Sequence, residues 1–338
     1  MTLKRIGKTF VAAVLAAAVP FAAQAQTTYQ AQFDSTLGTE MRTPQSFDAV
    51  YQSAFEQRIA ELADGSRGRI GVAAVDLSTG QQIGILDDQL FPMASTSKIA
   101  IAATFLEGVE KGRWSLTSEF PLLLPKRSAR FSSAVAPVYE GDHMKAIDLI
   151  EIMITRSSNP ATDALLRVVG GPKEVNAWMR RAGIKNFSLD RDIATLVRDD
   201  GEFDPANHID KRDSATPAAM LTLLKGLYQG DYLSASSRRV LLGAMSRTRT
   251  GKRRIPALMP AGVRVSHKTG SLNNTSSDIG ILEMPDGRAV AVAIYVTGQG
   301  TRLNREAKIA QIARALHDGY AAEKTRRIYA DANYGGGN

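Results

Sequence analysis

Hydrophobic residues recur at different spacings along this chain, and each spacing predicts a kind of element. From residue 47 to residue 62 they recur at a helical period, whereas from 68 to 86 they alternate loosely on either side of a turn at 76–80. The first pattern predicts a helix and the second a β-hairpin. The next segment, Ser95 to Val109, is apolar on nearly every side, which is typical of a buried central helix.

The middle of the chain keeps a helical pattern, and the last third returns to strands. Helices are predicted at residues 145–155, 160–169, 172–182 and 217–228, and strands at 263–266, 277–283 and 288–296, before a closing amphipathic helix at 304–320. Strands near both chain ends with helices between them predict an α/β fold, in the form of an α+β sandwich. We expect one antiparallel sheet built from both chain ends and flanked by helices, with an all-helical domain inserted in it.

The N-terminus has the pattern of an export signal. Lys4, Arg5 and Lys8 precede an apolar stretch at 10–23, and Ala23-Gln24-Ala25 is a small-x-small cleavage site. A membrane anchor is the alternative, but the stretch is short for a hydrocarbon core of about 30 Å and contains a proline. We therefore expect a periplasmic protein without stable membrane insertion.

These patterns divide the chain into six segments. They are a signal peptide (1–25), an N-terminal extension (26–45), the first part of an α/β domain (46–94), a helical domain (95–248), the second part of the α/β domain (249–325) and a disordered tail (326–338). The tail is assigned because the chain ends in Tyr-Gly-Gly-Gly-Asn.

The composition excludes several kinds of chemistry. The 338 residues include no cysteine, which excludes a thiol nucleophile, disulfides and thiolate metal ligands. The four histidines form no H-x-H or H-E-x-x-H pair and no G-x-S-x-G occurs, so we expect no metal, no cofactor and no Ser-His-Asp triad.

The net charge of +8 comes from basic residues that are spread along the chain, among them residues 252–254. We interpret them as solvated surface charge, with a mild attraction to anionic substrates or cell-wall polymer as the alternative. Nucleic-acid motifs are absent, and we expect a monomer with no nucleic-acid partner.

Three short motifs that carry chemistry stand in order along the chain: S-x-x-K at 95–98, S-x-N at 157–159 and K-T-G at 268–270. Ser95 is expected at a helix start, where unpaired backbone N–H groups and the helix dipole favour a developing oxyanion. Lys98 follows one helical turn later, so its amine can reach Ser95 and act as its base.

The other two motifs supply groups that can hold a substrate. Ser157 and Asn159 lie in a tight connection between two predicted helices, where Ser157 can pass a proton to a leaving nitrogen and Asn159 can hydrogen-bond an amide. Lys268 and Thr269 can bind a carboxylate, and the Ser271 N–H can complete an oxyanion hole with that of the nucleophile. Each motif alone has a structural alternative, but the three together predict a serine acyl-enzyme.

The motifs resemble those of the penicillin-recognising serine enzymes, and most closely those of the class A β-lactamases. The resemblance runs from about Phe47 to Tyr320 and implies a β-lactamase/transpeptidase-like fold with a five-stranded sheet. It also implies roles for the motif residues: nucleophile for Ser95, base for Lys98, proton relay for Ser157, substrate side-chain contact for Asn159, and carboxylate recognition for Lys268 and Thr269. Segments 189–191 and 212–217 resemble the two ends of the Ω-loop of the family, so Arg191 and Asp213 are expected to form the ion pair that closes it.

The chain departs from the class A pattern at two places. The middle motif is Ser-Ser-Asn instead of Ser-Asp-Asn, and the wider S-x-N form is shared with D-alanyl-D-alanine peptidases. The deacylating glutamate of the family follows just after the arginine of the loop, but residues 192–197 contain no glutamate and the loop is about seven residues longer than usual. Counting back from Asp213 makes Glu202 the hypothesis for the water-activating carboxylate, with Asp200 as its nearest rival and a solvated acidic loop as the alternative.

The resemblance favours a serine hydrolase of class A type, which opens the β-lactam ring of penicillins and cephalosporins. A D-alanyl-D-alanine peptidase that acts on peptidoglycan stem peptides is the first alternative. A non-catalytic penicillin-binding module is the second. The expected partner is a small β-lactam molecule or a peptidoglycan peptide.

Overall fold

The computed structural model describes the secondary structure of residues 53–334 and the side chains of residues 53–322. The described residues form one compact unit. The predicted signal peptide (1–25) and N-terminal extension (26–45) lie outside the described residues.

A five-stranded antiparallel sheet organises the unit, with the strand order β2-β1-β10-β9-β8. Its strands are β1 (Ile70–Asp76), β2 (Gln82–Ile85), β8 (Arg264–Leu272), β9 (Thr275–Glu283) and β10 (Ala289–Thr297). Strand β1 pairs with β10 over its whole length, from Ile70 opposite Val296 to Asp76 opposite Val290. The predicted sheet built from both chain ends is therefore confirmed.

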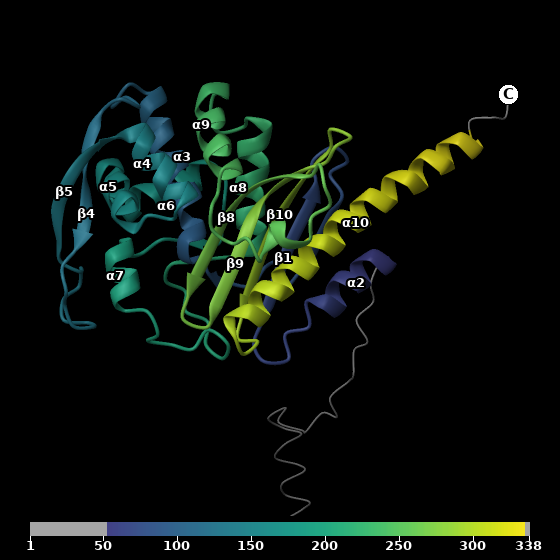
Figure 1. Cartoon of the computed structure of the whole chain (residues 1–338), viewed down its shortest axis with the longest axis horizontal. Helices are drawn as coiled ribbons and strands as arrows, with labels where there is room; N and C mark the ends of the chain where they lie inside the picture. Colours follow the sequence, from purple (N-terminus) through teal and green to yellow (C-terminus); the bar gives the residue numbers. More distant parts are fainter. Residues whose placement is uncertain (1–52, 335–338) are drawn as a thin grey trace, which may run out of the picture. The chain divides into compact units, whose positions relative to one another are not determined.

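Both faces of the sheet are covered by helices, which explains why every residue of β1 and β10 is buried. Helices α2 (Ala54–Leu62) and α10 (Arg302–Tyr334) cover one face, and α8 (Pro217–Gln229) packs on the other (Figure 1). Because side chains alternate across a strand, the sheet contributes to two separate cores. Val72 and Ile294 pack with the α10 residues Ile312 and Leu316, whereas Tyr295 points to the opposite core.

The region between β3 (Phe91–Pro92) and η2 (Ile255–Leu258) surrounds a central helix, α3 (Lys98–Glu110), ten of whose thirteen residues are buried. The prediction of a buried central helix is confirmed. The helices around it are α4 (Ala146–Thr155), α5 (Asn159–Val169), α6 (Pro172–Arg181), α7 (Ile193–Arg198) and α9 (Ala235–Ser246). Four of them, α4, α5, α6 and α9, contact α3, and β4 and β5 lie at the outer edge of this region (Figure 1).

The inserted region is not all-helical, which corrects the expectation from the sequence. It contains the antiparallel hairpin β4 (Glu119–Pro125) and β5 (Val138–Lys145), and a small sheet of β3, β7 (Ser214–Ala215) and β6 (Phe187–Ser188). The hairpin gave a weak signal because β4 begins and ends near prolines and β5 is mostly polar. Most residues of β5 are exposed, so this strand has no alternating apolar pattern.

Two boundaries also differ from the sequence prediction. Strand β8 continues through the K-T-G motif to Leu272, so the motif lies in the strand and not after it. Helix α10 continues to Tyr334, which corrects the disordered tail for residues 326–334. Residues 321–334 contain no glycine or proline and several good helix formers, so nothing in them ends the helix before the glycines at 335–337.

Candidate active site

The nucleophile candidate Ser95 lies in a short 3₁₀ turn, η1 (Ala94–Ser97), which leads directly into α3. The sequence predicted Ser95 in the helix itself. The turn is entered through Ala94 with φ of 49°, in the left-handed region that residues with a Cβ rarely adopt. Ser95 is half-buried, and the backbone N–H of Met93 donates to the Asp213 carbonyl at 3.0 Å, which ties the turn to the end of the Ω-loop.

Lys98 is fully buried at the first position of α3, and its ammonium group is held by the second motif. Its Nζ donates to the Ser157 carbonyl at 2.8 Å, to Ser157 Oγ at 3.2 Å and to Asn159 Oδ1 at 2.7 Å. Burial, aided by the charge of Lys268, lowers the pKa of Lys98 well below its usual value, and Asp163 opposes the shift. The lowered pKa makes it easier for Lys98 to lose a proton and so to act as a base.

The Ser157 hydroxyl bridges two buried lysines. Lys268 Nζ donates to Ser157 Oγ at 3.0 Å from the other side, and both lysines are fully buried. Ser157 adopts φ of 59°, which turns its side chain out of the helix junction between α4 and α5. Burial lowers the pKa of Lys268 to about 7. The nearby Asp278 carboxylate acts to raise this pKa, and the charge of Arg254 acts to lower it further. This hydroxyl is placed to move a proton between the two amines.

Asn159 opens helix α5, and the preceding Ser158 caps the helix by accepting from the Ala161 N–H at 3.3 Å. The Asn159 Oδ1 atom is already used by Lys98, so the side-chain NH₂ is the part that can donate to a substrate. The sequence-predicted contact with a substrate amide is compatible with this orientation.

Strand β8 runs past the Ser95 turn at Gly270. A Cβ at Gly270 would lie 2.4 Å from Ser277 Oγ and 2.7 Å from the Met93 carbonyl, so only glycine permits this approach. Next to it, Thr269 Oγ1 lies 2.7 Å from Thr250 Oγ1. The two hydroxyls place further hydrogen-bonding groups beside Lys268, at the position where a carboxylate is expected.

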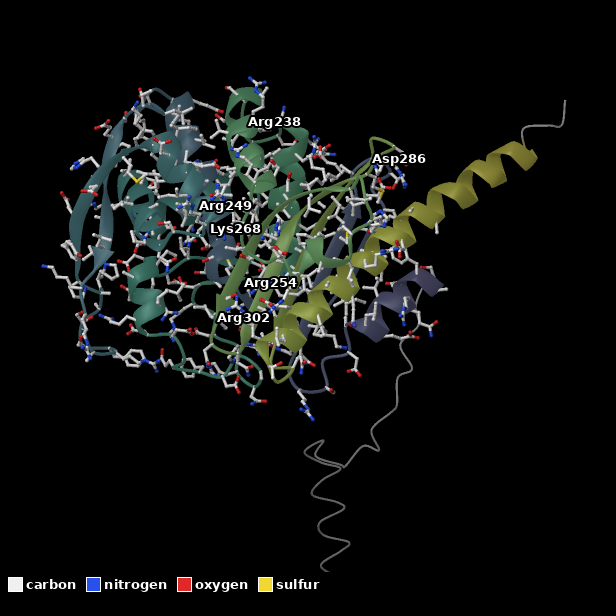
Figure 2. The ribbon with its side chains drawn as sticks, viewed as in Figure 1. Arg238, Arg249, Arg254, Lys268, Asp286 and Arg302 are labelled. Carbon is white, nitrogen blue, oxygen red and sulfur yellow. The ribbon has the colours of Figure 1, made fainter. Side chains whose placement is uncertain are left out.

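Arg254 corrects the interpretation of residues 252–254 as solvated surface charge. Its side chain is 1% exposed and lies behind β8, where Nη1 donates to the Gly270 and Ser277 carbonyls at 2.7 Å each. Its Nη2 donates to Ser271 Oγ at 2.6 Å and pairs with Glu306 of α10 at 3.1 Å (Figure 2). Arg254 therefore fixes the strand that carries Lys268 and keeps positive charge near it. No pattern in the sequence separates Arg254 from the exposed Lys252 and Arg253.

The ends of the Ω-loop (residues 191–213) are held by the expected ion pair. Arg191 Nε lies 2.6 Å from Asp213 Oδ2, and the Asp213 side chain is 3% exposed. Asp213 Oδ1 also accepts from the backbone N–H groups of Asp190 and Arg191, at 2.8 and 3.0 Å. A single carboxylate thus closes the loop through three hydrogen bonds.

Glu202 is not brought to the other predicted residues. It is an exposed residue of the Ω-loop, and its Oε2 atom pairs with Arg212 Nη2 at 2.6 Å. No hydrogen bond or ion pair among the described residues joins Glu202 to Ser95, Lys98 or Lys268. The charge of Arg212, ten residues further along the same loop, holds Glu202 in place instead.

Asp163 is a carboxylate near the site that the sequence analysis missed. It lies on α5, four residues after Asn159, and it is 4% exposed. Its carboxylate accepts from the backbone N–H of Ile193 at 2.7 Å and of Ala194 at 2.9 Å. Burial raises the pKa of Asp163 to about 7, despite these hydrogen bonds and the charge of Lys98. The sequence feature that could have indicated Asp163 is an acid on the inward face of the helix that begins in the S-x-N motif.

The site contains no evident metal ligand set: among residues 53–322, no three His, Asp or Glu side chains group in a way that suits a metal ion. Within the same part of the chain, no helix is long and apolar enough to cross a membrane.

Comparisons with known proteins agree with this geometry. The model of the β-lactamase enzyme family matches residues 54–320. The extended-spectrum β-lactamase PER-1 of Pseudomonas aeruginosa is 28% identical, over 80% of this chain and 89% of its own length. The β-lactamase CTX-M-25 of Escherichia coli is 31% identical, over 78% of this chain and 89% of its own.

Solved structures show the same relation. The structure of a β-lactamase from Chitinophaga pinensis is 29% identical with a TM-score of 0.69, and covers 79% of this chain and 100% of its own. A variant of the last common ancestor of the class A β-lactamases of Gram-negative bacteria is 34% identical with a TM-score of 0.68, over 80% of this chain and 100% of its own. The chain therefore belongs to the β-lactamase enzyme family, within class A.

Proposed function

We propose that this chain is a serine β-lactamase of class A type, which hydrolyses the lactam amide of penicillins and cephalosporins. The observation that carries the proposal is the Ser157 hydroxyl held between two buried lysines, 3.2 Å from Lys98 Nζ and 3.0 Å from Lys268 Nζ. Burying two cations beside one hydroxyl is unfavourable unless charges or hydrogen bonds compensate it. Such an arrangement is therefore unusual in a site that has only a structural role. The β-lactamases among its relatives support the same activity.

In the proposed acylation, Lys98 and Ser157 each take up one proton and give up one proton. Neutral Lys98 takes the proton of Ser95 Oγ as that oxygen attacks the lactam carbonyl carbon. The backbone N–H groups of Ser95 and Ser271 stabilise the resulting oxyanion. The ring C–N bond then breaks, and the leaving nitrogen takes the Ser157 proton while Ser157 recovers one from Lys98. Lys268 binds the substrate carboxylate throughout, assisted by Thr269, and Asn159 contacts the substrate side-chain amide.

Deacylation requires a water and a proton acceptor. Glu202 remains the candidate from the sequence, but its pairing with Arg212 argues against it, whereas Asp163 is a buried acid whose charge acts on Lys98. We expect Glu202→Gln to leave turnover unchanged. If deacylation proceeds through Asp163, Asp163→Asn keeps acylation fast and makes the acyl-enzyme accumulate, visible as a burst followed by slow turnover.

Steady-state hydrolysis of a chromogenic cephalosporin, with intact-mass spectrometry of the protein, tests the proposal. We expect turnover by the wild type and neither turnover nor an adduct in Ser95→Ala. A persistent adduct combined with cleavage of a D-alanyl-D-alanine peptide would identify a peptidase instead. A persistent adduct without any cleavage would identify a penicillin-binding module, and a penicillin adduct on Ser95→Ala would overturn the assigned nucleophile.

We also propose that the protein acts in the periplasm as a monomer. The export pattern of residues 1–25 and the substrates of the proposed reaction support this location. Recovery of the protein in the periplasmic fraction, with a mature N-terminus at Gln26, is the expected result. Light scattering of the purified protein checks the oligomeric state.

A further inference from the structure

Strand β8 carries a histidine directly before Lys268, and this histidine contacts an acid of β9. His267 Nδ1 lies 2.8 Å from Asp278 Oδ1 and 3.0 Å from Asp278 Oδ2. The His267 side chain is 4% exposed, and the side chain of Asp278 is fully buried. We call these two residues the histidine–aspartate pair. Neither the proposed acylation nor the proposed deacylation has a use for it.

The pairing of β8 with β9 places the histidine–aspartate pair beside the substrate anchor. Asp278 lies directly opposite Thr269 in the antiparallel register. Residues opposite each other have Cα atoms about 4.5–5.5 Å apart, and successive side chains of a strand alternate between its faces. His267, Thr269 and Asp278 therefore share one face of the sheet, and the Lys268 side chain leaves from the other. The pair thus lies behind the strand at the position of Lys268.

The surroundings of Asp278 favour its ionised form. Burial lowers the pKa of Lys268 and of Arg254, and in both cases Asp278 is the charge that acts most strongly to raise it. Asp278 Oδ2 also accepts from the Ile255 N–H at 3.2 Å. Because an ionised carboxylate can only accept hydrogen bonds, His267 Nδ1 carries a proton and donates to Asp278. The imidazole therefore fixes the orientation of the carboxylate.

Asp278 is also the counter-charge of Lys268. The charged groups of the site come from five parts of the fold: Lys98 of α3, Asp163 of α5, Arg254 before η2, Asp278 of β9 and Glu306 of α10. Asp163 acts on Lys98, and Glu306 is bound to Arg254 at 3.1 Å. Among the described residues, Asp278 is the acid whose charge raises the pKa of Lys268. A buried ammonium group that lacks a counter-charge loses its proton readily.

We propose that Asp278 and His267 are positioning residues for substrate binding: the Asp278 carboxylate keeps Lys268 charged for the carboxylate of the substrate, and His267 fixes the Asp278 carboxylate. Both residues act through Lys268 from behind the strand and do not touch the substrate. The capture of anionic substrates around neutral pH then depends on the histidine–aspartate pair. This inference rests on the proposed function, because that function assigns the substrate carboxylate to Lys268.

The experiment measures kcat/KM against pH for a carboxylate-bearing cephalosporin and for its neutral ester. In the wild type, the ratio of acid to ester should fall through about pH 7, as Lys268 loses its charge. Asp278→Asn should move the midpoint of this fall to lower pH by about one unit, because an opposite charge nearby favours the charged form. At pH 7 the acid substrate then loses about fivefold relative to the ester.

Two variants of His267 provide a second test that keeps Asp278 itself intact. His267→Ala should move the midpoint in the same direction by a smaller amount. His267→Asn should restore the wild-type midpoint, since its amide can place an N–H donor near the position of Nδ1. Asp231→Asn removes an exposed acid at the α8–α9 connection and should leave the midpoint unchanged. If Asp278→Asn does not fold, the two His267 variants decide the question.

Lys268→Arg separates an electrostatic role from a structural one. An arginine stays charged over this pH range, so Lys268→Arg combined with Asp278→Asn should have the same profile as Lys268→Arg alone. An equal loss from Asp278→Asn with lysine and with arginine at position 268 would overturn the proposal. An unchanged midpoint in both Asp278→Asn and His267→Ala would overturn it too. If neither substrate forms an acyl-enzyme with the wild type, the proposed function fails instead.

Discussion

Lys98 and Lys268 show how one half-buried hydroxyl can organise two buried amines. Ser157 Oγ accepts a hydrogen bond from each, and burial lowers the pKa of both lysines. In the proposed mechanism Lys98 is the base, whereas Lys268 is the proposed anchor of the substrate carboxylate, with a charge that depends on pH near neutrality. The two lysines have different tasks although they share one partner.

The first prediction concerns the pH dependence of substrate capture. The pKa of Lys268 is about 7 in the folded protein, so the ammonium is present below pH 7 and is lost as the pH rises through this value. We expect kcat/KM for a carboxylate-bearing cephalosporin to fall above pH 7, and kcat/KM for its neutral ester to stay flat. Lost contacts to a charged group are worth about 1.5–3 kcal/mol, so the fall should reach about tenfold or more.

Lys268→Arg serves as the matched variant, because an arginine stays protonated over this range. If the variant binds substrate, its alkaline fall should disappear. Equal pH profiles for the acid and the ester would show that Lys268 is only a structural cation.

The second prediction concerns Asp163 and the pH dependence of stability. Its pKa is about 7 in the folded protein, against an ordinary value of 3.8, so between these two pH values the folded state holds an extra proton. The contribution of this group to the free energy of unfolding is complete below about pH 4 and is lost as the pH rises to about 7.

In Asp163→Asn this loss cannot occur. Urea unfolding between pH 4 and pH 8 should show the stability of the variant, relative to the wild type, increasing with pH up to about 7 and then levelling off. The asparagine loses one N–H acceptor, so its absolute stability carries a constant offset and the slope is the informative quantity. Parallel curves for the two proteins would contradict the raised pKa.

At the scale of elements, the Ω-loop depends on the carboxylate that closes it. Asp213 is 3% exposed at its side chain and adopts φ of 47°, a conformation that asparagine tolerates. Asp213→Asn therefore preserves the backbone but removes the charge that pairs with Arg191. We expect a loss of about 3–5 kcal/mol in the free energy of unfolding, or cleavage of the loop by protease before global unfolding.

Asp210→Asn in the same loop is the control, since its partner Arg212 is 41% exposed and such pairs contribute about 1 kcal/mol or less. Similar losses in both variants would indicate that the loop is stabilised by its overall charge and not by its closing pair.

The helices and strands also show which patterns in a sequence are enough to predict an element. The buried helix α3 and the hairpin of β1 and β2 could be predicted because their apolar patterns are continuous. Strand β8 was predicted too short, since its second half is polar on account of the K-T-G motif, and backbone pairing with β9 extends it to Leu272. The backbone hydrogen bonds of the β8–β9 hairpin set this extension, and they require no alternation of apolar side chains that the sequence would reveal.

In the candidate site too, residues in short motifs could be predicted, whereas residues placed by distant contacts could not. The motifs predicted Ser95, Lys98, Ser157 and Lys268 as site residues, because each motif keeps its reactive groups within a few residues of one another. Hydrogen bonds to Ser157 Oγ join Lys98 and Lys268. Glu202 was assigned by counting along a loop, where the path of the chain is not periodic, and Arg212 binds it elsewhere. Arg254 could not be distinguished from exposed arginines because its burial depends on Glu306, fifty-two residues away.

At the scale of the whole molecule, α10 completes one core through residues 309–320. Ile309, Ile312, Leu316 and Tyr320 are buried against the sheet, and the family match ends at residue 320. We expect a chain that ends at Ala322 to unfold within about 1 kcal/mol of the full chain, because it keeps the α10 residues of this core and the whole of the family match. Leu316→Ala should lose about 2–5 kcal/mol in the same denaturant titration. A large loss on truncation would show that the last turns of α10 carry stability.

The pairing of β1 with β10 has a consequence for synthesis. At about 5–20 residues per second, the interval between completing Asp76 and completing Thr297 is on the order of 10–45 s. During this time the nascent chain presents the apolar segment 70–75 to the ribosome surface and to holdase chaperones without its β10 partner. The central sheet cannot form before nearly the whole polypeptide has been made. Until then the chain lacks its folded core and can still pass through a secretion channel.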